Sequence, residues 1–356
     1  MLAPLGTRRR SLQIALFDTH SYDRESFEAE RGQFAHELVY LEPRLTAETA
    51  ALARGHEVVC SFVNDKLTAS ALELLHAGGT RLLALRCAGY NHVDLAAAAR
   101  LGIPVLRVPE YSPYAVAEHA VALLLAIDRK IHRAHARVRE WNFSLDGLVG
   151  FDLHGKTVGL IGTGRIGRAA ARIFNGFGCR VLAHDLRADP ATGAELGIRF
   201  VELRELYEQS DVVSLHVPLN PATHHLIDAA ALARMKRGVI LINTGRGALI
   251  DSRALIKALK AEHLGGAGLD VYEEEEGVFF QDLSNQVLQD DVLARLLSFP
   301  NVLITSHQAF LTREALSSIA RVTLENVSAF ARGEPLTNAV RLEQVLPPSE
   351  GSATDR

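Results

Sequence analysis

The chain has 356 residues, of which 48% are hydrophobic and 22% are charged, and its formal net charge is −4. This length suffices for two domains, and the composition is ordinary for a soluble globular protein. A pI of about 6.4 argues against a nucleic-acid partner, the three cysteines lack the spacing of a zinc site or a disulfide framework, and no apolar run approaches the ~20 residues that cross a bilayer. We therefore expect a cytoplasmic protein that has no metal centre and binds neither nucleic acid nor membrane.

The two ends of the chain have compositions unlike the rest. The basic triplet Arg8–Arg10 precedes a strand-like segment rather than a signal-peptide core, so we interpret it as a solvated tail. Residues 346–356 are small, polar and led by prolines, which predicts a disordered tail.

In the first hundred residues, short apolar runs alternate with helical patterns. Strands are expected at Leu12–Phe17, Glu57–Phe62, Leu82–Arg86 and Val105–Val108, and helices at Ala69–His76 and Leu95–Leu101. This alternation predicts a parallel sheet with right-handed crossovers.

A long helical pattern follows, from Tyr114 to Arg139. Its first half is rich in alanine and leucine on most faces, and its second half is basic. We expect one helix, buried between domains or in a dimer.

A second alternating series begins at Lys156. Strands are expected at Thr157–Ile161, Arg180–His184, Val212–His216, Val239–Ile242, Gly266–Leu269 and Val302–Thr305, with helices between them, as at Ile166–Gly176 and Ser252–Lys260. Six such strands predict a doubly wound nucleotide-binding domain. The helix expected at Arg313–Arg332 would return to the first domain.

The predicted fold is therefore α/β, with a Rossmann-type doubly wound parallel sheet and a second parallel α/β domain that is discontinuous in sequence. The substrate domain would comprise residues 11–110 and 309–345, and the nucleotide-binding domain residues 111–308.

A glycine-rich motif lies between the first strand of the second series and its helix. Gly162, Gly164 and Gly167 satisfy G-x-G-x-x-G, in which the glycines permit a tight turn, approach of a pyrophosphate and close helix packing. The helix N-terminus favours the phosphates. Asp185 lies 18 residues after Gly167, where an acid can bind ribose hydroxyls and repel a 2′-phosphate. This arrangement favours NAD over NADP.

Two further side chains follow expected strands at the same edge of the sheet. Arg246, between Gly245 and Gly247, could hold a carboxylate with two parallel hydrogen bonds. His307 could exchange a proton near neutral pH, which reduction of a carbonyl requires. One member of the acidic run Glu273–Glu276 could orient His307, but spacing alone does not select which.

These segments resemble the D-isomer-specific 2-hydroxyacid dehydrogenases. The resemblance is carried by the glycine-rich motif together with the segments Leu85–Asp94, Val108–Ala120, Asn142–Leu145, Asn243–Asp251, Leu269–Glu273 and His307–Thr312. Phe279–Asp282, Ser284-Asn285 and Gln308 resemble the fermentative D-lactate dehydrogenase subgroup. One departure is Ser306, which stands where close relatives often have glycine.

The resemblance implies a role for each matching residue. Arg246 would bind and polarise the substrate, His307 would be the acid/base, and Glu275, five residues after Asp270, would be its carboxylate partner. The backbone amides of Ala88 and Gly89 would also hold the substrate carboxylate, and Tyr111 would line the pocket. The implied cofactor contacts are Arg165, Ile166, Asp185, Val217, Pro218, Thr244 and Asp270, in addition to Gly162, Gly164 and Gly167. The 114–139 helix would join a homodimer or homotetramer, and the second domain would be flavodoxin-like.

The function expected from this resemblance is NAD-dependent reduction of pyruvate to D-lactate. A relative that acts on a bulkier 2-oxo acid is an alternative with the same chemistry. A third hypothesis is an NAD-sensing, non-enzymatic corepressor, which the combination of Arg246, Glu275 and His307 disfavours.

Overall fold

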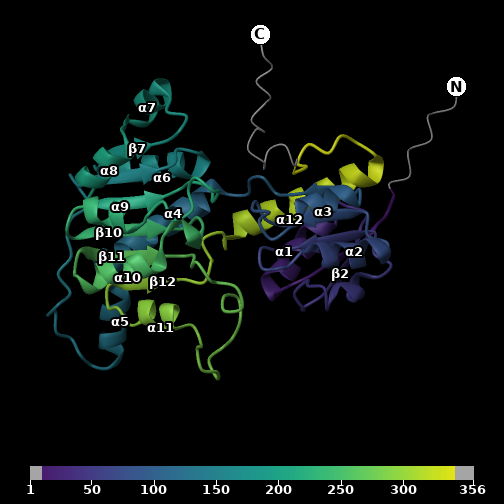
Figure 1. Ribbon diagram of the computed structural model, residues 1–356, viewed down its shortest axis with the longest axis horizontal. Helices are drawn as coiled ribbons and strands as arrows, with labels where there is room; N and C mark the ends of the chain where they lie inside the picture. The colour runs from purple at the N-terminus through teal and green to yellow at the C-terminus, as the bar shows by residue number, and fades with distance from the viewer. Residues whose placement is uncertain (1–9, 341–356) are drawn as a thin grey trace, which may run out of the picture. The chain divides into compact units, whose positions relative to one another are not determined.

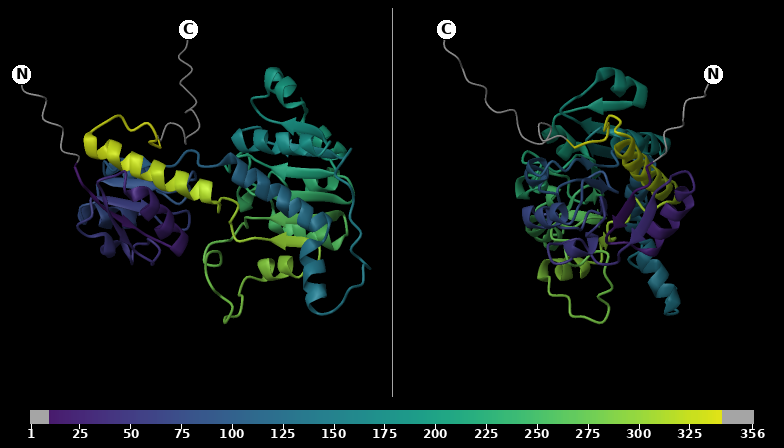
Figure 2. Two further views of the ribbon diagram at one scale, coloured as in Figure 1. Left: turned by 180° about the vertical axis from the view of Figure 1, so that it is seen from behind. Right: turned by 90° about the vertical axis from the view of Figure 1, so that its right-hand side faces the viewer.

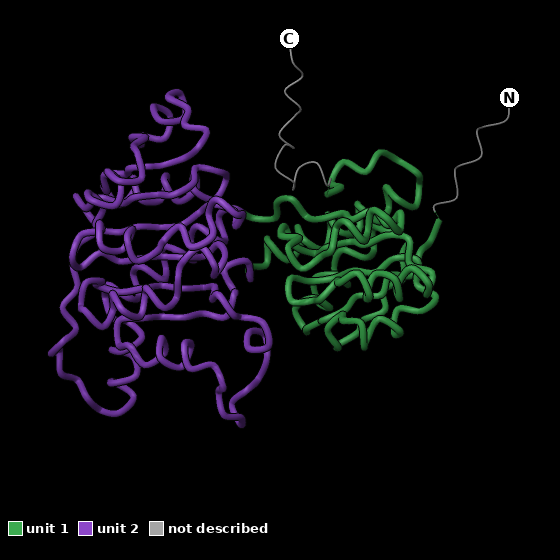
Figure 3. Tube along the Cα trace, viewed as in Figure 1, with its two compact units in different colours: residues 1–112, 312–356 green, residues 113–311 purple. Residues whose placement is uncertain are grey.

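The computed structural model describes residues 10–340, so the expectations for Arg8, Arg9 and the 346–356 tail lie outside the described residues. The chain divides into two compact units (Figure 3). Unit 1 contains the residues up to Ser112 and those from Thr312 onward, and unit 2 contains Pro113–Leu311. These two boundaries were expected at 110/111 and 308/309.

Unit 1 is built on a parallel five-stranded sheet (Figure 1). The strands are β1 Gln13–Leu16, β2 Glu37–Tyr40, β3 Val58–Ser61, β4 Leu82–Leu85 and β5 Val105–Leu106. The helices are α1 Ser21–Arg31, α2 Ala69–Ala77, α3 Leu95–Arg100 and α12 Arg313–Arg332, with the 3-10 turn η1 Ala50–Ala53. The strand order β2-β1-β3-β4-β5 is the flavodoxin-like order, which confirms the fold class expected for this part of the chain.

The C-terminal helix α12 completes the core of unit 1. Its buried residues Ala320, Leu324 and Val327 join Phe27 of α1 in one apolar cluster over the sheet. In Figures 1 and 2 this helix, in yellow, lies along the purple and blue elements from the N-terminal part of the chain. The chain therefore returns to unit 1 after completing unit 2.

Unit 2 is built on a parallel seven-stranded sheet with the order β12-β11-β10-β9-β6-β7-β8. The strands are β6 Thr157–Ile161, β7 Arg180–His184, β8 Ile198–Phe200, β9 Val212–Leu215, β10 Val239–Asn243, β11 Leu264–Leu269 and β12 Val302–Ile304. The helices are α4 Pro113–Asp128, α5 Ile131–Arg139, α6 Arg165–Gly176, α7 Pro190–Leu196, α8 Leu203–Gln209, α9 Ala229–Arg234, α10 Ser252–Lys260 and α11 Asp291–Leu297, with the 3-10 turn η2 Gly247–Leu249. Chain order reverses on either side of β6, as in a doubly wound nucleotide-binding sheet.

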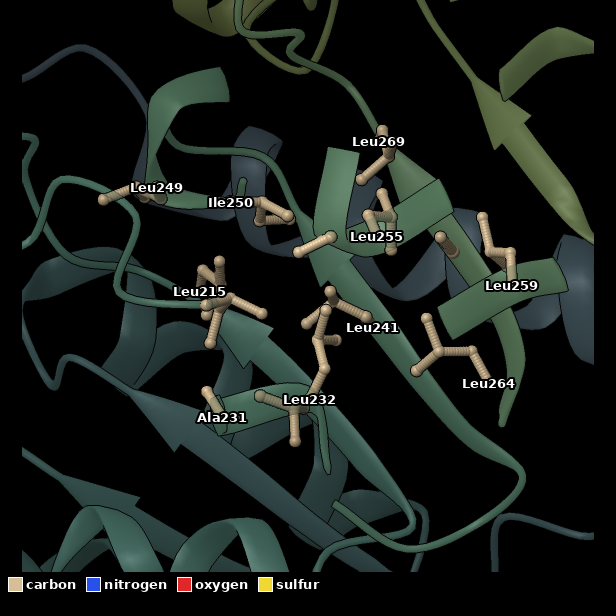
Figure 4. Packing of buried hydrophobic residues seen from close by; sticks show 14 of the residues in the cluster. Leu215, Ala231, Leu232, Leu241, Leu249, Ile250, Leu255, Leu259, Leu264 and Leu269 are labelled. Carbon is tan, nitrogen blue, oxygen red and sulfur yellow. The ribbon is translucent and has the colours of Figure 1, made fainter. Parts of the chain in front are cut away.

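Both faces of this sheet are covered because side chains alternate along each strand. Leu241 packs into a cluster with α8, α9, α10 and α11, whereas its neighbours Ile240 and Ile242 pack on the opposite face with α4 and α6. Figure 4 shows the first cluster, in which Leu249 and Ile250 lie with side chains from α9, α10 and three strands. The segment that follows Arg246 is thus anchored in the core.

Two expectations for unit 2 were wrong. The predicted six strands lack β8, a three-residue edge strand. The single helix expected from Tyr114 to Arg139 is two helices, because Lys130 adopts a left-handed conformation with φ +51°. The buried Asp128 carboxylate accepts the N–H of Phe151, which draws the returning chain against the end of α4.

Helix α4 buries its alanines and leucines within unit 2 itself. Ala117, Ala120 and Leu124 pack in the same cluster as Ala170 of α6 and Ile242 of β10. The apolar composition of this helix is therefore explained by its own sheet, and α5, which has no buried residue, remains exposed. Within residues 10–340, no helix is both long and apolar enough to span a membrane.

Candidate active site

The strands of unit 2 deliver the candidate residues to one edge of the sheet. Gly162 follows β6, Asp185 follows β7, Thr244 follows β10 and His307 follows β12. In a parallel sheet the carboxyl ends of the strands share one edge, and ligands bind there at the point where strand order reverses. The structure thus brings the glycine motif and the acid/base candidate to the same edge.

The three glycines of the motif differ in their surroundings. A Cβ on Gly162, whose φ is +99°, would lie 2.5 Å from the carbonyl oxygen of His216, and a Cβ on Gly167 would overlap the carbonyl oxygen of Gly162. In contrast, a Cβ on Gly164 would meet nothing within 4 Å. Packing therefore requires Gly162 and Gly167, whereas the exposed Gly164 leaves open space at the N-terminus of α6, where a pyrophosphate would need it.

Asp185 closes the other side of the glycine-rich turn. One of its carboxylate oxygens accepts the N–H and the hydroxyl of Thr163, at 2.7 and 2.9 Å, and the other accepts the N–H of Arg187 at 2.9 Å. Partial burial alone would raise the pKa of this carboxyl, but the hydrogen bonds from Arg187 and Thr163 hold it below its usual range. Asp185 is consequently ionised at neutral pH and presents negative charge beside the turn.

The remaining cofactor candidates differ in exposure. Arg165 is exposed and Ile166 half-buried in the first turn of α6, while Val217 is half-buried and Pro218 exposed after β9. The buried hydroxyl of Thr244 has no hydrogen-bond partner among the described residues. An unsatisfied buried hydroxyl at the ligand-binding edge fits a bound cofactor, as does the open space above Gly164.

Two carboxylates position His307. Glu275 contacts its ring, and Asp270 accepts backbone N–H groups of the residues that follow it. Nδ1 of His307 lies 2.8 Å from Oε1 of Glu275, and the other oxygen of Glu275 accepts the N–H of Tyr272 at 3.2 Å. The side chains of His307 and Glu275 are 14% and 20% exposed. Because Nδ1 faces the carboxylate, Nε2 remains to exchange a proton with a ligand.

Along the acidic run Glu273–Glu276, successive side chains alternate between half-buried and exposed. Glu274 and Glu276 are exposed, whereas Glu273 and Glu275 are half-buried. Glu275 contacts His307, and Glu273 contacts a different histidine, His225. The structure therefore distinguishes four glutamates that the sequence pattern could not.

Asp270 organises the backbone around His307. Its carboxylate accepts the N–H groups of Gln308 and Ala309, both at 2.9 Å, and its carbonyl accepts the N–H of His307 at 2.7 Å. Burial alone would raise the pKa of Asp270, but hydrogen bonds from His119, Thr305 and Ala309 hold it below its usual range. The carboxylate, which is fully buried, is thus turned toward protein donors.

This support explains the strained backbone at His307. Its φ of +50° is uncommon for a residue other than glycine. Ser306 adds a further link, because its hydroxyl accepts the N–H of Phe280 at 3.3 Å. The departure from glycine at this position therefore ties the loop containing Phe280 to the histidine.

Arg246 is half-buried in the turn after β10. Its guanidinium donates to the carbonyl of Gly245 at 2.7 Å, and the described residues give it no carboxylate partner. The side chain of Asn243 bridges the turn by donating to the carbonyl of Arg246 and accepting the N–H of Gly245. The guanidinium is available to an anionic ligand on a fixed turn.

In unit 1, Ala88 and Gly89 follow β4 in a loop held by its carbonyl groups. Arg107 donates to the carbonyl of Ala88 at 2.8 Å, and the thiol of Cys87 donates to that of Gly89 at 3.1 Å. No described acceptor binds the N–H groups of Ala88 or Gly89. Tyr111 is half-buried just before the end of this part of unit 1.

The buried ion pair of Arg86, which directly precedes this loop, was not predicted from the sequence. Arg86 is fully buried and donates to the carbonyls of Phe17 and Asp18 and to the carboxylate of Asp23. A charged residue that ends an apolar strand, as in Leu82–Arg86, was the available signal, since a buried charge requires partners.

Comparison with known proteins assigns the family. Residues 121–309 match the model described as D-isomer specific 2-hydroxyacid dehydrogenase, NAD binding domain. The chain is 50% identical to the D-lactate dehydrogenase of Escherichia coli K12, over 92% of this chain and 99% of the relative. It is 51% identical to a 2-hydroxyacid dehydrogenase homolog of Zymomonas mobilis, over 92% of this chain and all of the relative.

A solved structure agrees with these sequences. The pyruvate reductase of Chlamydomonas reinhardtii is 45% identical, with a TM-score of 0.87 over 92% of this chain and 98% of that chain. The chain belongs to the D-isomer-specific 2-hydroxyacid dehydrogenase family. It is an oxidoreductase with NAD as its cofactor, as the glycine motif and Asp185 predicted.

Proposed function

We propose that this protein is an NAD-dependent D-lactate dehydrogenase that reduces pyruvate to D-lactate. The observation that carries the proposal is the 2.8 Å contact between His307 and Glu275 at the ligand-binding edge of an NAD-binding sheet. The identity to a relative named D-lactate dehydrogenase supports pyruvate as the substrate.

Each candidate side chain has a task in this reaction. When bound, NADH supplies the hydride that reduces the carbonyl carbon. The guanidinium of Arg246 binds the substrate carboxylate and orients the carbonyl. His307 gives a proton from Nε2 to the carbonyl oxygen, and the carboxylate of Glu275 fixes the ring and stabilises its protonated form.

The residues of unit 1 are proposed as further substrate contacts. The N–H groups of Ala88 and Gly89 have no acceptor among the described residues, so they can donate to the substrate carboxylate. Tyr111 is proposed to line the pocket, on the strength of the family resemblance.

The cofactor contacts are proposed at the edge of the unit 2 sheet. The pyrophosphate would lie over Gly164 and the first turn of α6, where Arg165 and Ile166 are, and Asp185 would receive the ribose hydroxyls. Val217, Pro218 and Thr244 would contact the rest of the cofactor, and Asp270 would act there by holding the loop of His307. The three cysteines are buried and none forms a disulfide within residues 10–340, which supports a reducing compartment such as the cytoplasm.

A substrate panel tests the choice of 2-oxo acid. Steady-state rates of NADH oxidation should give the highest kcat/KM with pyruvate and lower values with phenylpyruvate and 2-ketoisocaproate. A higher kcat/KM for a bulkier acid would replace pyruvate while leaving the chemistry in place. No turnover of any 2-oxo acid by the folded protein would contradict the proposed activity.

We also propose that α5 and the segment after it join two copies of the chain. Six large apolar side chains here are more than half exposed, namely Ile131, Val138, Trp141, Phe143, Leu145 and Val149. Contiguous exposed apolar surface is typical of protein–protein interfaces. Light scattering should give a dimer or tetramer for the wild type and a smaller species for Trp141→Glu/Leu145→Glu, and an unchanged mass for the folded variant would contradict this interface.

A further inference from the structure

Two adjacent histidines and one glutamate come together in unit 2. Their hydrogen bonds do not involve the His307–Glu275 pair. One ligand atom from each of His224, His225 and Glu273 can be chosen so that all three lie within 4.8 Å of one another. Within residues 10–340, this is the one group of three or more histidine, cysteine or acidic side chains with that geometry. The expectation of no metal centre rested on the spacing of the cysteines, and this group contains none. Its glutamate lies 48 residues beyond His225, so a short sequence motif does not contain all three residues.

The backbone turns both imidazoles toward the same side. Successive side chains of an extended chain point in opposite directions. His225 instead has a left-handed conformation, with φ +51°, and the two rings stack with centroids 3.9 Å apart and an interplanar angle of 28°. A positive φ at a residue other than glycine is uncommon and persists only where surrounding contacts hold it.

Hydrogen bonds fix the segment on both sides of these rings. Asn220 accepts the N–H of His224 with its carbonyl at 2.9 Å, and the N–H of His225 donates to the carbonyl of Ala248 at 2.8 Å. The histidines therefore project from a braced turn.

Glu273 is oriented from the opposite side. Its Oε1 lies 2.5 Å from Nε2 of His225, and its Oε2 accepts the N–H of Ser252, the first residue of α10, at 3.3 Å. Hydrogen bonds of this kind to the second oxygen orient carboxylates that bind metals. The side chains of His225 and Glu273 are 33% and 25% exposed, and His224 is more exposed, so an ion could enter from solvent.

We propose that His224, His225 and Glu273 form a binding site for one Zn²⁺ ion. Two imidazoles and one carboxylate are the ligand set of many zinc sites that keep a fourth position for water, whereas Mg²⁺ and Ca²⁺ prefer oxygen ligands. Tetrahedral bonds of about 2.0–2.1 Å place neighbouring ligand atoms about 3.3 Å apart. The His225–Glu273 pair must then open by about 0.8 Å and His224 must move inward, which side-chain rotations can provide.

The ion would join three segments of unit 2. His224 and His225 lie in the connection that begins with Val217 and Pro218, Glu273 lies between Asp270 and Glu275, and Ser252 begins α10. Occupancy would therefore raise the thermal midpoint of the protein, since a ligand that binds only the folded state stabilises it.

Zinc binding to the full-length, EDTA-treated protein tests the proposal without any activity measurement. Competition with a chromophoric zinc indicator should show one tightly bound ion per chain, and zinc should raise the thermal midpoint. His224→Asn and Glu273→Gln should each weaken binding at least tenfold, because each removes a direct ligand, and loss of a residue that only orients a ligand already costs that much. Co²⁺ should give the intense visible bands of four- or five-coordinate cobalt in the wild type and lose them in both variants.

Two control variants separate this site from other histidines. His154→Asn, which is exposed and lies outside the segment proposed to join two copies, should bind zinc as the wild type does, and so should His307→Gln, which removes the other histidine–glutamate pair. His224 is exposed, so its variant should keep the metal-free circular dichroism spectrum. Absence of stoichiometric binding by the wild type, or equal affinity in wild type and His224→Asn, would overturn the site. Loss of binding in His307→Gln alone would assign the ion to the active-site pair instead.

Discussion

Replacing each of two glycines by alanine should separate cofactor binding from folding. Gly164 has φ −62° and ψ −171°, which alanine adopts without strain, and its added Cβ would meet nothing within 4 Å. Alanine is a poorer N-cap than glycine, so we expect a loss of stability of about 0.5–1 kcal/mol at most. The Cβ would, however, occupy the space proposed for the pyrophosphate, and we expect NADH affinity to fall at least tenfold, about 1.4 kcal/mol.

Gly167→Ala should behave differently because its Cβ overlaps the backbone oxygen of Gly162. The turn and α6 must move apart, at a cost of about 1–3 kcal/mol. For a domain of the size of unit 2, each kcal/mol lowers the thermal midpoint by about 2–4 °C. We therefore expect a fall of roughly 2–12 °C for Gly167→Ala, and at most about 4 °C for Gly164→Ala.

The assay pairs thermal unfolding of the apoprotein with NADH titration followed by fluorescence. The expected pattern is that Gly164→Ala loses affinity with little change in stability, whereas Gly167→Ala loses both. A folded Gly164→Ala variant that binds NADH as tightly as the wild type would refute the placement of the pyrophosphate over Gly164.

Three further changes probe the other groups. Arg246→Lys keeps the charge but loses the two-pronged geometry, so kcat/KM for pyruvate should fall at least tenfold with NADH binding unchanged, and an unaltered kcat/KM would exclude Arg246 as the clamp. Glu275→Gln should lower kcat at least tenfold, on the scale of general acid–base catalysis, whereas the exposed neighbour Glu274→Gln should not, and equal losses would argue against a specific partner for His307. The pKa of Asp185 lies below its usual range, so its carboxylate stays ionised as the pH is lowered from 8 to about 6. Asp185→Ala should therefore shrink the preference for NADH over NADPH at either pH, with Arg187 available to a 2′-phosphate, and an unchanged ratio of kcat/KM for NADH and NADPH would place the discrimination elsewhere.

Buried strands were predictable because they are continuous apolar runs. Thr157–Ile161 and Arg180–His184 were predicted at the residues where β6 and β7 are found. β2 and α1 were not predicted because neither is a continuous apolar run. β2 lies at a sheet edge and has no buried residue, and α1 is polar, with Phe27 as its one buried apolar side chain. Hydrophobic periodicity detects burial rather than hydrogen bonding.

Conformations with positive φ at ordinary residues were not predictable. The break between α4 and α5 occurs at Lys130, and the turns that present His225 and His307 have the same left-handed geometry. Glycine or asparagine would have suggested such turns, but lysine and histidine do not. These conformations depend on distant partners, such as Asp270 beneath His307, that a local pattern does not contain.

The selection of Glu275 had the same limitation. Four consecutive glutamates are equivalent in sequence, and only the family resemblance favoured one. In the structure, the direction of each side chain decides which of them meets a histidine.

In the proposed reaction, His307 donates the proton when pyruvate is reduced to D-lactate. The most direct test measures NADH oxidation and the chirality of the product for the wild type and His307→Gln, at saturating NADH and pyruvate. We expect D-lactate alone from the wild type, and a loss in kcat of about 10²-fold or more in the variant with NADH binding retained. Formation of L-lactate would exclude a D-lactate dehydrogenase, and a folded His307→Gln variant that keeps most of the wild-type kcat would exclude His307 as the proton donor.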